Sequence, residues 1–416
     1  MDKIENRRLK TSNLTSFLVL GFLEAAFAPM VPYIKERFNL DEGSLGLLLL
    51  CTGIGSFLSL PLVGAAVGRF GCRKATAVTG LAMGLLLLTL ALSQNLYLTG
   101  VALFVFGAAT IGIDVSSNVN AVLVEEKLKR PLMSGFHAGY SLGTLGGSML
   151  VTLLLTMGLG LVTGSVTVLI IGALAVFFGT RYLISDVKGS EKQKEAEEEH
   201  SQESEEKVPT IFGIPTLILI IGCMCFIMYS LEGAVMSWSG VFVTQERGMP
   251  LEVAGFIYSS FAIAMTVMRF VGNKMVSKIG RRLTVVVGSL LVSLGFMLTV
   301  LINHPIGAAL GFLTVGLGAA NIVPQLVSFA GSVPGISVHR AITFINALGY
   351  SGILCGPVII GFTSKLSSLS ATFTGIAVIV LIVGIVGFKV LRIKKKGDTA
   401  GSDAPAVMPA PATANA

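Results

Sequence analysis

Three carboxylates stand inside long apolar segments of this sequence. Glu24, Asp114 and Glu232 each have mostly apolar neighbours on both sides. An ionised side chain at the centre of a bilayer costs at least about 2.5–3.5 kcal/mol, so acids at such positions usually have a function. Proton transfer is a chemistry that carboxylates perform there. We expect all three acids to carry protons, and Glu24 and Glu232 also to contact a solute.

Asp114 is the acid that we expect to titrate first. It lies deep in its apolar segment, and helical spacing places Thr110, Asn118 and Ala121 on its face. A polar stripe among apolar faces predicts a wet cavity. The alternative is that Asp114 is a structural acid that forms a hydrogen bond to a neighbouring helix. The matching position in the second half of the chain, near Pro324, is neutral, which suits a proton carrier confined to one half.

Further polar residues recur at helical spacing inside the apolar segments. Hydroxyl and amide side chains on one helix face can line a solute path, although they also join helices to one another. An aromatic ring beside hydroxyl groups suits stacking on a sugar-like ring, although a Trp also anchors helices at the membrane surface. The candidate solute contacts besides the acids are Asn118, Ser141, Trp238, Asn321, Gln325, Asn346 and Tyr350.

Basic residues are expected only at the ends of the apolar segments. Arg269 is placed with the cytoplasmic residues, and no Lys or Arg is expected at the depth of the acids. This absence argues against an anionic solute as the main cargo.

The elements that must position these residues are membrane-spanning helices. Only 13% of the residues are charged, against about 25% in a soluble chain. Apolar runs of about 20 residues are long enough to cross a bilayer as helices. The predicted fold is an all-α membrane protein with twelve spans: 14–34, 44–66, 75–93, 98–122, 134–157, 161–184, 211–241, 251–274, 283–302, 306–331, 341–362 and 368–391.

The orientation follows from the basic residues. With the N-terminus inside, 26 Lys and Arg residues fall on the cytoplasmic side, and only Lys35, Arg37, Arg247 and Lys365 fall outside. Short loops rich in Lys and Arg stay in the cytoplasm. We therefore expect a multi-pass protein of the bacterial inner membrane, with both termini cytoplasmic.

The chain repeats itself at about 210 residues, as Gly71 and Gly280 show within similar basic loops. The prediction is two six-helix halves, 1–188 and 210–396. Residues 189–209 form a charged cytoplasmic linker, because Ser190–Lys207 is too charged to bury a core. Residues 397–416 form a disordered Ala- and Pro-rich tail.

Other classes of protein are disfavoured. The net charge of +7 lies in short clusters between apolar runs, which argues against nucleic-acid binding. The five cysteines show no zinc spacing, and no cofactor or metal motif is present. Gly139–Gly143 matches the GxSxG nucleophile pattern, but this motif needs a strand-to-helix turn and here lies in a helix. We expect no catalytic residue and no enzyme.

Two sets of motifs carry a family resemblance. Residues Gly64 to Lys74, with Gly68, Arg69, Gly71 and Arg73, resemble the signature loop of the major facilitator superfamily, and Gly272–Arg282 is a weaker copy. Residues 114–118, 136–143, 232–239 and 318–324 resemble its fucose-permease-like branch, in particular the YbjJ-type transporters. The resemblance implies acids in the first and fourth helices at a sugar and proton site, roles that Glu24 and Asp114 fit. The candidate gating residues are Gly68, Arg69, Gly71, Arg73, His137, Gly280 and Arg281.

The expected function is secondary active transport by a monomer, with the solute site between the halves near the midplane. Proton-coupled symport of a small hydrophilic solute, such as a sugar, is the first expectation. Export of drugs or metabolites by proton antiport is the second, and a channel or transport-like sensor is the alternative from another class.

Overall fold

Long helices side by side make up nearly all of the described chain. The computed structural model describes residues 3–129, 132–184, 210–211, 214–333, 335–336 and 338–391. The elements are α1 (Lys3–Ala25), η1 (Ala28–Met30), α2 (Val31–Arg37), α3 (Glu42–Leu92), α4 (Leu96–Leu128), α5 (Met133–Thr156), α6 (Gly160–Leu174), η2 (Ala175–Gly179), β1 (Thr210–Ile211), β2 (Ile214–Pro215), α8 (Thr216–Glu246), α9 (Leu251–Leu301), α10 (Pro305–Ala319), α11 (Ile322–Ala330), α12 (Val338–Leu366) and α13 (Leu369–Val390). Strands β1 and β2 pair antiparallel, with Thr210 opposite Pro215.

The helices are of membrane-spanning length and composition. In the described residues, 11 helical segments are long and apolar enough to cross a bilayer. The sequence-based prediction of an all-helical membrane protein is therefore confirmed, whereas its count of twelve spans is not matched directly. Helix α3 counts as one segment although its 51 residues would extend about 76 Å, more than twice a bilayer core.

Two glycines turn the chain sharply inside α3 and α9. Gly71 has φ 80° and ψ 160°, and Gly280 has φ 78° and ψ 159°. Only glycine adopts such backbone angles without a steric penalty. The two near-identical geometries, 209 residues apart, are the structural form of the repeat seen in the sequence.

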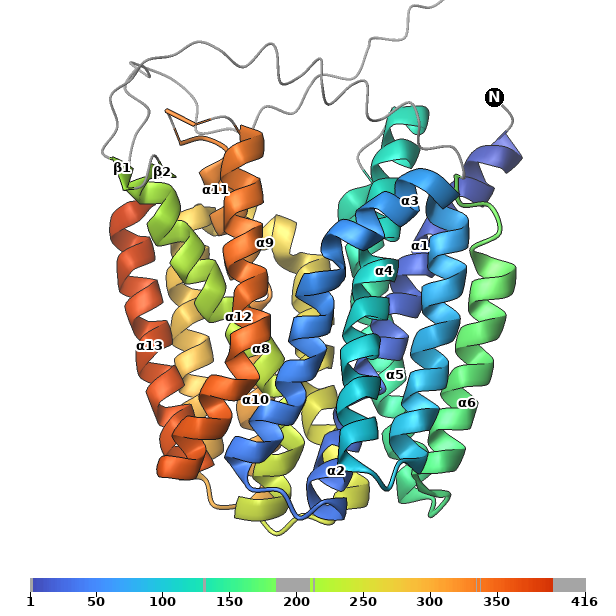
Figure 1. Cartoon of the computed structure of the whole chain (residues 1–416). Helices are drawn as coiled ribbons and strands as arrows, with labels where there is room; N and C mark the ends of the chain where they lie inside the picture. Colours follow the sequence, from blue (N-terminus) through green and yellow to red (C-terminus); the bar gives the residue numbers. More distant parts are fainter. Residues whose placement is uncertain are drawn as a thin grey trace, which may run out of the picture.

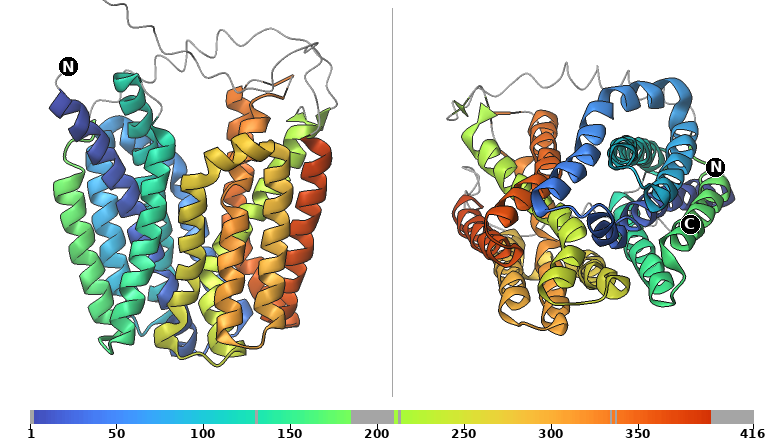
Figure 2. Two further views of the ribbon diagram at one scale, coloured as in Figure 1. Left: turned by 180° about the vertical axis from the view of Figure 1, so that it is seen from behind. Right: turned by 60° about the horizontal axis from the view of Figure 1, so that its bottom comes forward.

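Figure 1 shows two groups of helices. The first group is α1 to α6 with η2, and the second is α8 to α13; Figure 2 shows the same division from behind and from below. We call the end of the bundle that carries Gly71 and Gly280 the kink end, which is uppermost in Figure 1, and the end that carries α2 the sealed end. The predicted linker 189–209 and tail 397–416 lie outside the described residues.

Glycines let helices approach closely within the first group. A Cβ atom at Gly143 or Gly147 of α5 would overlap backbone atoms of Leu18 or Phe22 in α1. Gly139 and Gly143 therefore serve helix crossing, and the Ser141 between them lies inside a helix and not at a nucleophile turn.

Three helices are interrupted where single spans were predicted. Helix α1 ends at Ala25, and the short elements η1 and α2 follow, with Pro29 and Pro32 near their starts. The predicted span 306–331 is broken between α10 and α11 by Asn321, since Pro324 cannot donate to the carbonyl four residues earlier. The predicted span 161–184 ends as a π-helix, η2, followed by a turn.

Two arginines at equivalent positions of the sequence repeat cap helices at the sealed end. The Arg37 side chain donates to the carbonyls of Leu90 and Ala91 at the end of α3, at 2.8 and 2.9 Å. Arg247, 210 residues later, donates to the carbonyls of Thr299 and Val300 at the end of α9, both at 2.9 Å. These carbonyls have no partner within their own helices, so each arginine caps a helix C-terminus.

Close packing of the two groups at the sealed end can be tested at Gly255 of α9. A Cβ atom there would overlap Thr152 Oγ1 of α5 and lie 2.9 Å from Cγ of Pro29. We expect Gly255→Ala to lower thermal stability by about 1–3 kcal/mol, the usual cost of overpacking. The control is Gly375→Ala in α13, where nothing lies within 4 Å. Unfolding is followed by the fluorescence of Trp238, the only Trp in the sequence. Equal midpoints for the two variants would contradict the close contact.

Candidate functional site

Glu24 lies at the end of α1, directly before the helix breaks. Its Oε2 accepts a hydrogen bond of 2.9 Å from the Tyr140 hydroxyl of α5. Both side chains are half-buried. The charge of Glu24 also interacts with those of Asp114 and Glu232, which places the three predicted acids in one neighbourhood.

Asp114 of α4 is held from both groups of helices. Asn118, one turn along α4, donates through Nδ2 to Asp114 Oδ1 at 2.9 Å. The hydroxyl of Tyr350, on α12 of the second group, donates to Asp114 Oδ2 at 3.4 Å. The predicted face of Asp114 and Asn118 therefore meets the other group of helices.

Arg269 of α9 pairs with the third acid. Its Nη2 lies 3.8 Å from Glu232 Oε2, and the side chains are 27% and 26% exposed. Its Nη1 donates to Ser141 Oγ on α5 at 2.8 Å, which joins the two groups of helices. The expectation that no basic residue lies at the depth of the acids is wrong, because α9 continues past Arg269 to Gly280 before it turns.

We call these residues the central cluster: Glu24, Asp114, Glu232, Arg269, Tyr140 and Tyr350. Tyr258 of α9 adjoins it, since its hydroxyl interacts with the charges of Glu24, Glu232 and Arg269. The cluster contains three carboxylates and one guanidinium, so it can bind protons or cations and can also hold an anionic group. Sequence reasoning missed Arg269 and the tyrosines Tyr140, Tyr229 and Tyr258.

The hydrogen bonds between the two groups of helices end at the depth of the central cluster. In the described residues they run from Asp41–Lys365 at the sealed end, through Ser148–Ser259, to Ser141–Arg269 and Asp114–Tyr350. The side chains of Glu232 and Arg269 and the residue Tyr350 are partly exposed at this depth.

The sequence is similar to that of known membrane proteins over most of its length. A sequence model of the Major Facilitator Superfamily matches residues 14–338. An uncharacterised MFS-type transporter of Yersinia pestis is 37% identical over 90% of this chain and 94% of its own length. The chain belongs to the major facilitator superfamily. Membrane protein MosC of Rhizobium meliloti is 27% identical over 88% of this chain and 86% of its length.

A solved structure agrees at the level of the fold. A crystal structure of a mutant of the nucleoside transporter NupG superposes with a TM-score of 0.71 at 14% identity, covering 92% of this chain and 100% of that one. The match to the superfamily model and to the MFS-type relative shows that this chain is a multi-pass membrane transporter and not an enzyme. In the part that the structure describes, no three His, Cys, Asp or Glu side chains are grouped to hold a metal ion.

Trp238, the aromatic residue predicted to contact the solute, does not lie on an exposed surface. Trp238 of α8 is fully buried, and its Nε1 has no hydrogen-bond partner, so it offers no ring face to a solute in this conformation. The rings of Tyr229 and Tyr350 stack with centroids 6.0 Å apart, and Tyr350 is 40% exposed. These tyrosines are the aromatic surface beside the central cluster.

The remaining predicted contacts lie outside the central cluster. Asn321 is buried and donates to the Met268 carbonyl at 3.1 Å, so it supports α9 next to Arg269. Gln325 and Asn346 are half-buried in α11 and α12. Neither is joined to the central cluster by a hydrogen bond in the described residues.

The predicted gating residues lie at the kink end and not in the central cluster. Arg281 donates to Ser328 Oγ at 3.0 Å, and His137 lies edge-on to Phe17 at 5.1 Å. The guanidinium of Arg69 lies 5.3 Å from the centroid of the Phe70 ring. Gly68 precedes the kink of α3 at Gly71, and Arg73 follows it. Among the described residues, none of these side chains forms a hydrogen bond or ion pair between the two groups, although His137 interacts with the charge of Arg269 in the second group.

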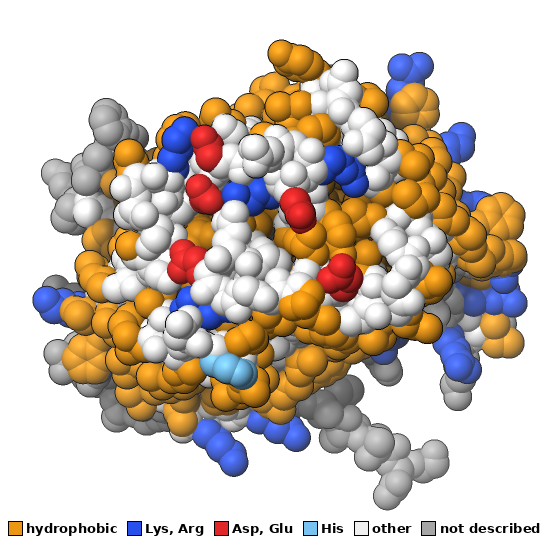
Figure 3. Space-filling view, turned by 90° about the horizontal axis from the view of Figure 1, so that it is seen from below, with side chains coloured by type: hydrophobic (Ala, Val, Ile, Leu, Met, Phe, Trp, Pro, Cys, Tyr) orange, Lys and Arg blue, Asp and Glu red, His pale blue; other side chains and the backbone are white. Residues whose placement is uncertain are grey.

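Charged side chains gather on the face of the sealed end, where Figure 3 shows acidic and basic groups close together. Lys35 Nζ lies 3.2 Å from Glu42 Oε1 within the first group. Lys365 of α12 crosses to Asp41 of the first group, with Nζ and Oδ2 2.9 Å apart. We call the Asp41–Lys365 pair the latch.

Breaking the latch is expected to have a small effect on opening at the sealed end. Lys365→Gln removes the ion pair but leaves the hydrogen bond from Ser44 N to Asp41. An exposed ion pair contributes little to stability, so we expect opening at the sealed end to rise only a few-fold. The readout is maleimide labelling of a Cys placed at buried Ser259, in a chain whose own cysteines are replaced by Ser.

The pH dependence of the latch follows from Asp41. The Ser44 backbone N–H and then Lys365 lower the pKa of Asp41 to about 2. A lowered pKa means that the interaction is complete above about pH 4 and is lost as the pH falls through 2. The ratio of the labelling rates of Lys365→Gln and the wild type, measured at the same pH because the thiolate is the reactive form, should therefore be unchanged from pH 5 to pH 8. The control is Lys127→Gln, which breaks a similar exposed pair with Glu5 inside the first group; equal labelling of both variants would rule out the latch.

Proposed function

We propose that this protein is a proton-coupled symporter that carries a small hydrophilic solute by alternating access. The first and second groups of helices act as the two rocking halves, 1–188 and 210–396, and the solute binds at the central cluster. The present conformation is open at the kink end, and a second conformation is open at the sealed end. A sugar or a similar polar ring compound is the proposed cargo.

Twelve crossings and a cytoplasmic kink end are part of this proposal. Helix α3 turns at Gly71 as α9 does at Gly280, so α3 supplies two crossings in place of one. The kink end carries most Lys and Arg residues, which favours the cytoplasmic side of the bacterial inner membrane for it and for both termini.

The observation that carries the proposal is the pair of polar contacts between the halves at mid-depth. Arg269–Ser141 and Asp114–Tyr350 each connect one half with the other. Such bonds cost little to exchange for bonds to a polar solute, whereas apolar helix faces offer none. Transporters of this kind bind their cargo near the midplane, at the interface of the two halves.

The four charged residues of the central cluster comprise one ion pair and two acids that have no cationic partner in the described part of the chain. Glu232 and Arg269 lie close enough to neutralise each other. Glu24 and Asp114 have only neutral hydrogen-bond partners, Tyr140, Asn118 and Tyr350. These two acids are therefore the proposed proton carriers, and Arg269 with the tyrosines is the proposed solute contact. A proton crossing 100 mV supplies roughly 2.3 kcal/mol, enough for about a 50-fold gradient of a neutral solute.

A thermal-shift screen of the purified protein tests the solute class. The library holds monosaccharides, polyols, amino sugars and, because a nucleoside transporter shares the fold, nucleosides. The expected result is stabilisation by polar ring compounds, followed by counterflow of the best compound in proteoliposomes. Exchange stimulation supports a carrier, whereas flux without stimulation would indicate a channel and binding without flux a sensor.

A further inference from the structure

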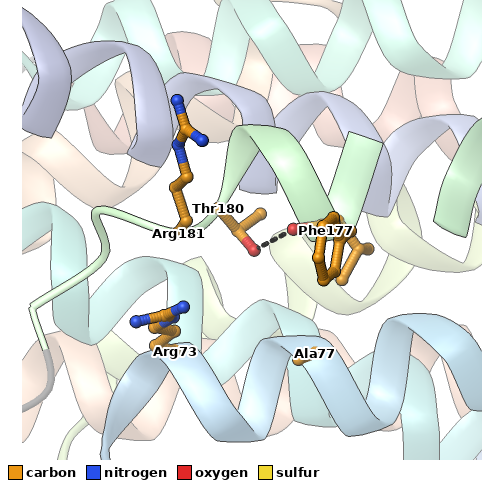
Figure 4. Close-up of a pocket in the computed structure, with 6 residues that line it drawn as sticks. Arg73, Ala77, Phe177, Thr180 and Arg181 are labelled. Atoms are coloured by element: carbon orange, nitrogen blue, oxygen red, sulfur yellow. Dashed lines mark hydrogen bonds between the residues drawn. The ribbon is translucent and has the colours of Figure 1, made fainter. Parts of the chain in front are cut away.

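Two grooves flank the end of α6 and η2, on the outer side of the first half and away from the central cluster. One groove, of about 190 Å³, is lined by Arg73 of α3 with Phe177, Thr180 and Arg181; in Figure 4 the Arg181 side chain extends away from Arg73, and its guanidinium lies over Tyr182 of the second groove. The other, of about 340 Å³, is lined by Arg7 and Arg8 of α1 with Phe178 and Tyr182.

The four arginines have no acidic partner among the described residues. The guanidinium groups of Arg8 in α1 and of Arg181, the residue before Tyr182, both lie over the ring of Tyr182, at 5.1 and 4.9 Å from its centroid. These cation–π contacts fix the guanidinium groups without neutralising them. Arg7 and Arg73 are exposed and form no ion pair there. Within the described residues, the grooves therefore present four positive charges without an acidic partner.

Exposed aromatic rings stand directly beside these charges. Phe177 is 72% exposed and Phe178 is 57% exposed, at the end of a membrane-spanning segment. In a bilayer such rings face lipid chains, whereas the arginines beside them lie at the depth of the headgroups. The volumes of the grooves suit a headgroup, so acyl chains would lie outside, along the phenylalanines.

We propose that the two grooves form a binding site for the headgroup of an anionic phospholipid. The guanidinium fork suits the geometry of a phosphate oxygen pair. Basic pockets between membrane helices recognise such headgroups. A free phosphate would use the arginines alone, whereas the adjoining exposed rings commit the site to a lipid.

The test measures lipid binding to the full-length protein in detergent by native mass spectrometry. The probe is dioleoyl phosphatidylglycerol, and the comparison lipid is dioleoyl phosphatidylethanolamine, which has no net charge. We expect the wild type to retain the anionic lipid preferentially. Arg73→Gln with Arg181→Gln should weaken its binding about tenfold or more, because the phosphate loses the charge-assisted hydrogen bonds of both guanidinium groups.

The control removes the same charge from the same end. Lys10→Gln with Lys74→Gln changes two exposed residues that line neither groove, and binding should stay within about twofold of the wild type. Equal loss in both double variants would show that the lipid senses net charge and not this site. Unchanged binding in the arginine variant, or equally tight binding of soluble glycerol 3-phosphate, would also overturn the proposal. Thermal midpoints of both variants confirm that they are folded.

Discussion

Asp114→Asn should abolish accumulation driven by a proton gradient while counterflow of the solute continues. The amide keeps the size of the side chain and can still bond to Asn118 and Tyr350, but it cannot bind or release a proton. The wild type should concentrate the compound found in the screen by up to about 50-fold at 100 mV, and the variant by about onefold. The measurement is uptake into proteoliposomes with and without an imposed pH gradient.

Asn118→Asp is not a suitable control for this experiment, because it would add a charge. Tyr350→Phe is suitable, because it removes only the hydroxyl that bonds to Asp114 across the two halves. It should weaken solute exchange but preserve the response to the pH gradient. If Asp114→Asn still accumulates the solute when the gradient is imposed, the coupling acid is another residue, and Glu24 is tested next.

Arg269→Gln is expected to have the second large effect, on solute binding. The change removes the only guanidinium of the central cluster and its bond to Ser141 Oγ, and it leaves Glu232 without its cation. We expect affinity to fall by about tenfold or more, since one hydrogen bond to a charged group contributes about 1.5–3 kcal/mol. Isothermal titration with the compound from the screen measures this loss.

A second variant separates binding from folding. In Arg269→Gln with Glu232→Gln, both charges of the pair are gone, so thermal stability should return toward that of the wild type whereas affinity should not. Lys278→Gln is the matched control, since Lys278 is an exposed basic residue of the same helix. Wild-type affinity in Arg269→Gln would refute the role of Arg269 as a solute contact.

The hydropathy pattern predicted the membrane helices well, because each must satisfy its own backbone and expose apolar side chains. It did not predict the breaks at Ala26–Phe27 and Asn321. Pro29 and Pro324 signal such breaks, but a proline inside an apolar run can also produce a kink, as Pro61 and Pro357 within continuous helices show. The outcome depends on neighbouring helices that a local pattern does not contain.

The sequence indicated the acids of the candidate site but not the residues that contact them. An isolated carboxylate in an apolar run stands out by its cost, so Glu24, Asp114 and Glu232 are visible in the sequence. Arg269 is close to the basic turn at Gly280 and was counted with it, although apolar Phe270 and Val271 separate it from Lys274. Tyr140, Tyr229 and Tyr258 look like ordinary apolar residues until packing places their hydroxyl groups beside charges.

The measurement that tests the central claim most directly is gradient-driven uptake by the wild-type protein. Proteoliposomes are loaded at one pH and diluted into buffer of lower pH with the compound from the screen, and internal solute and internal pH are followed together. The account predicts that the solute rises above its external concentration and that the interior acidifies faster with solute present. Uptake that stops at equal concentrations with no solute-dependent acidification would contradict proton-coupled symport, and acidification accelerated only by solute loaded inside the vesicles would indicate antiport.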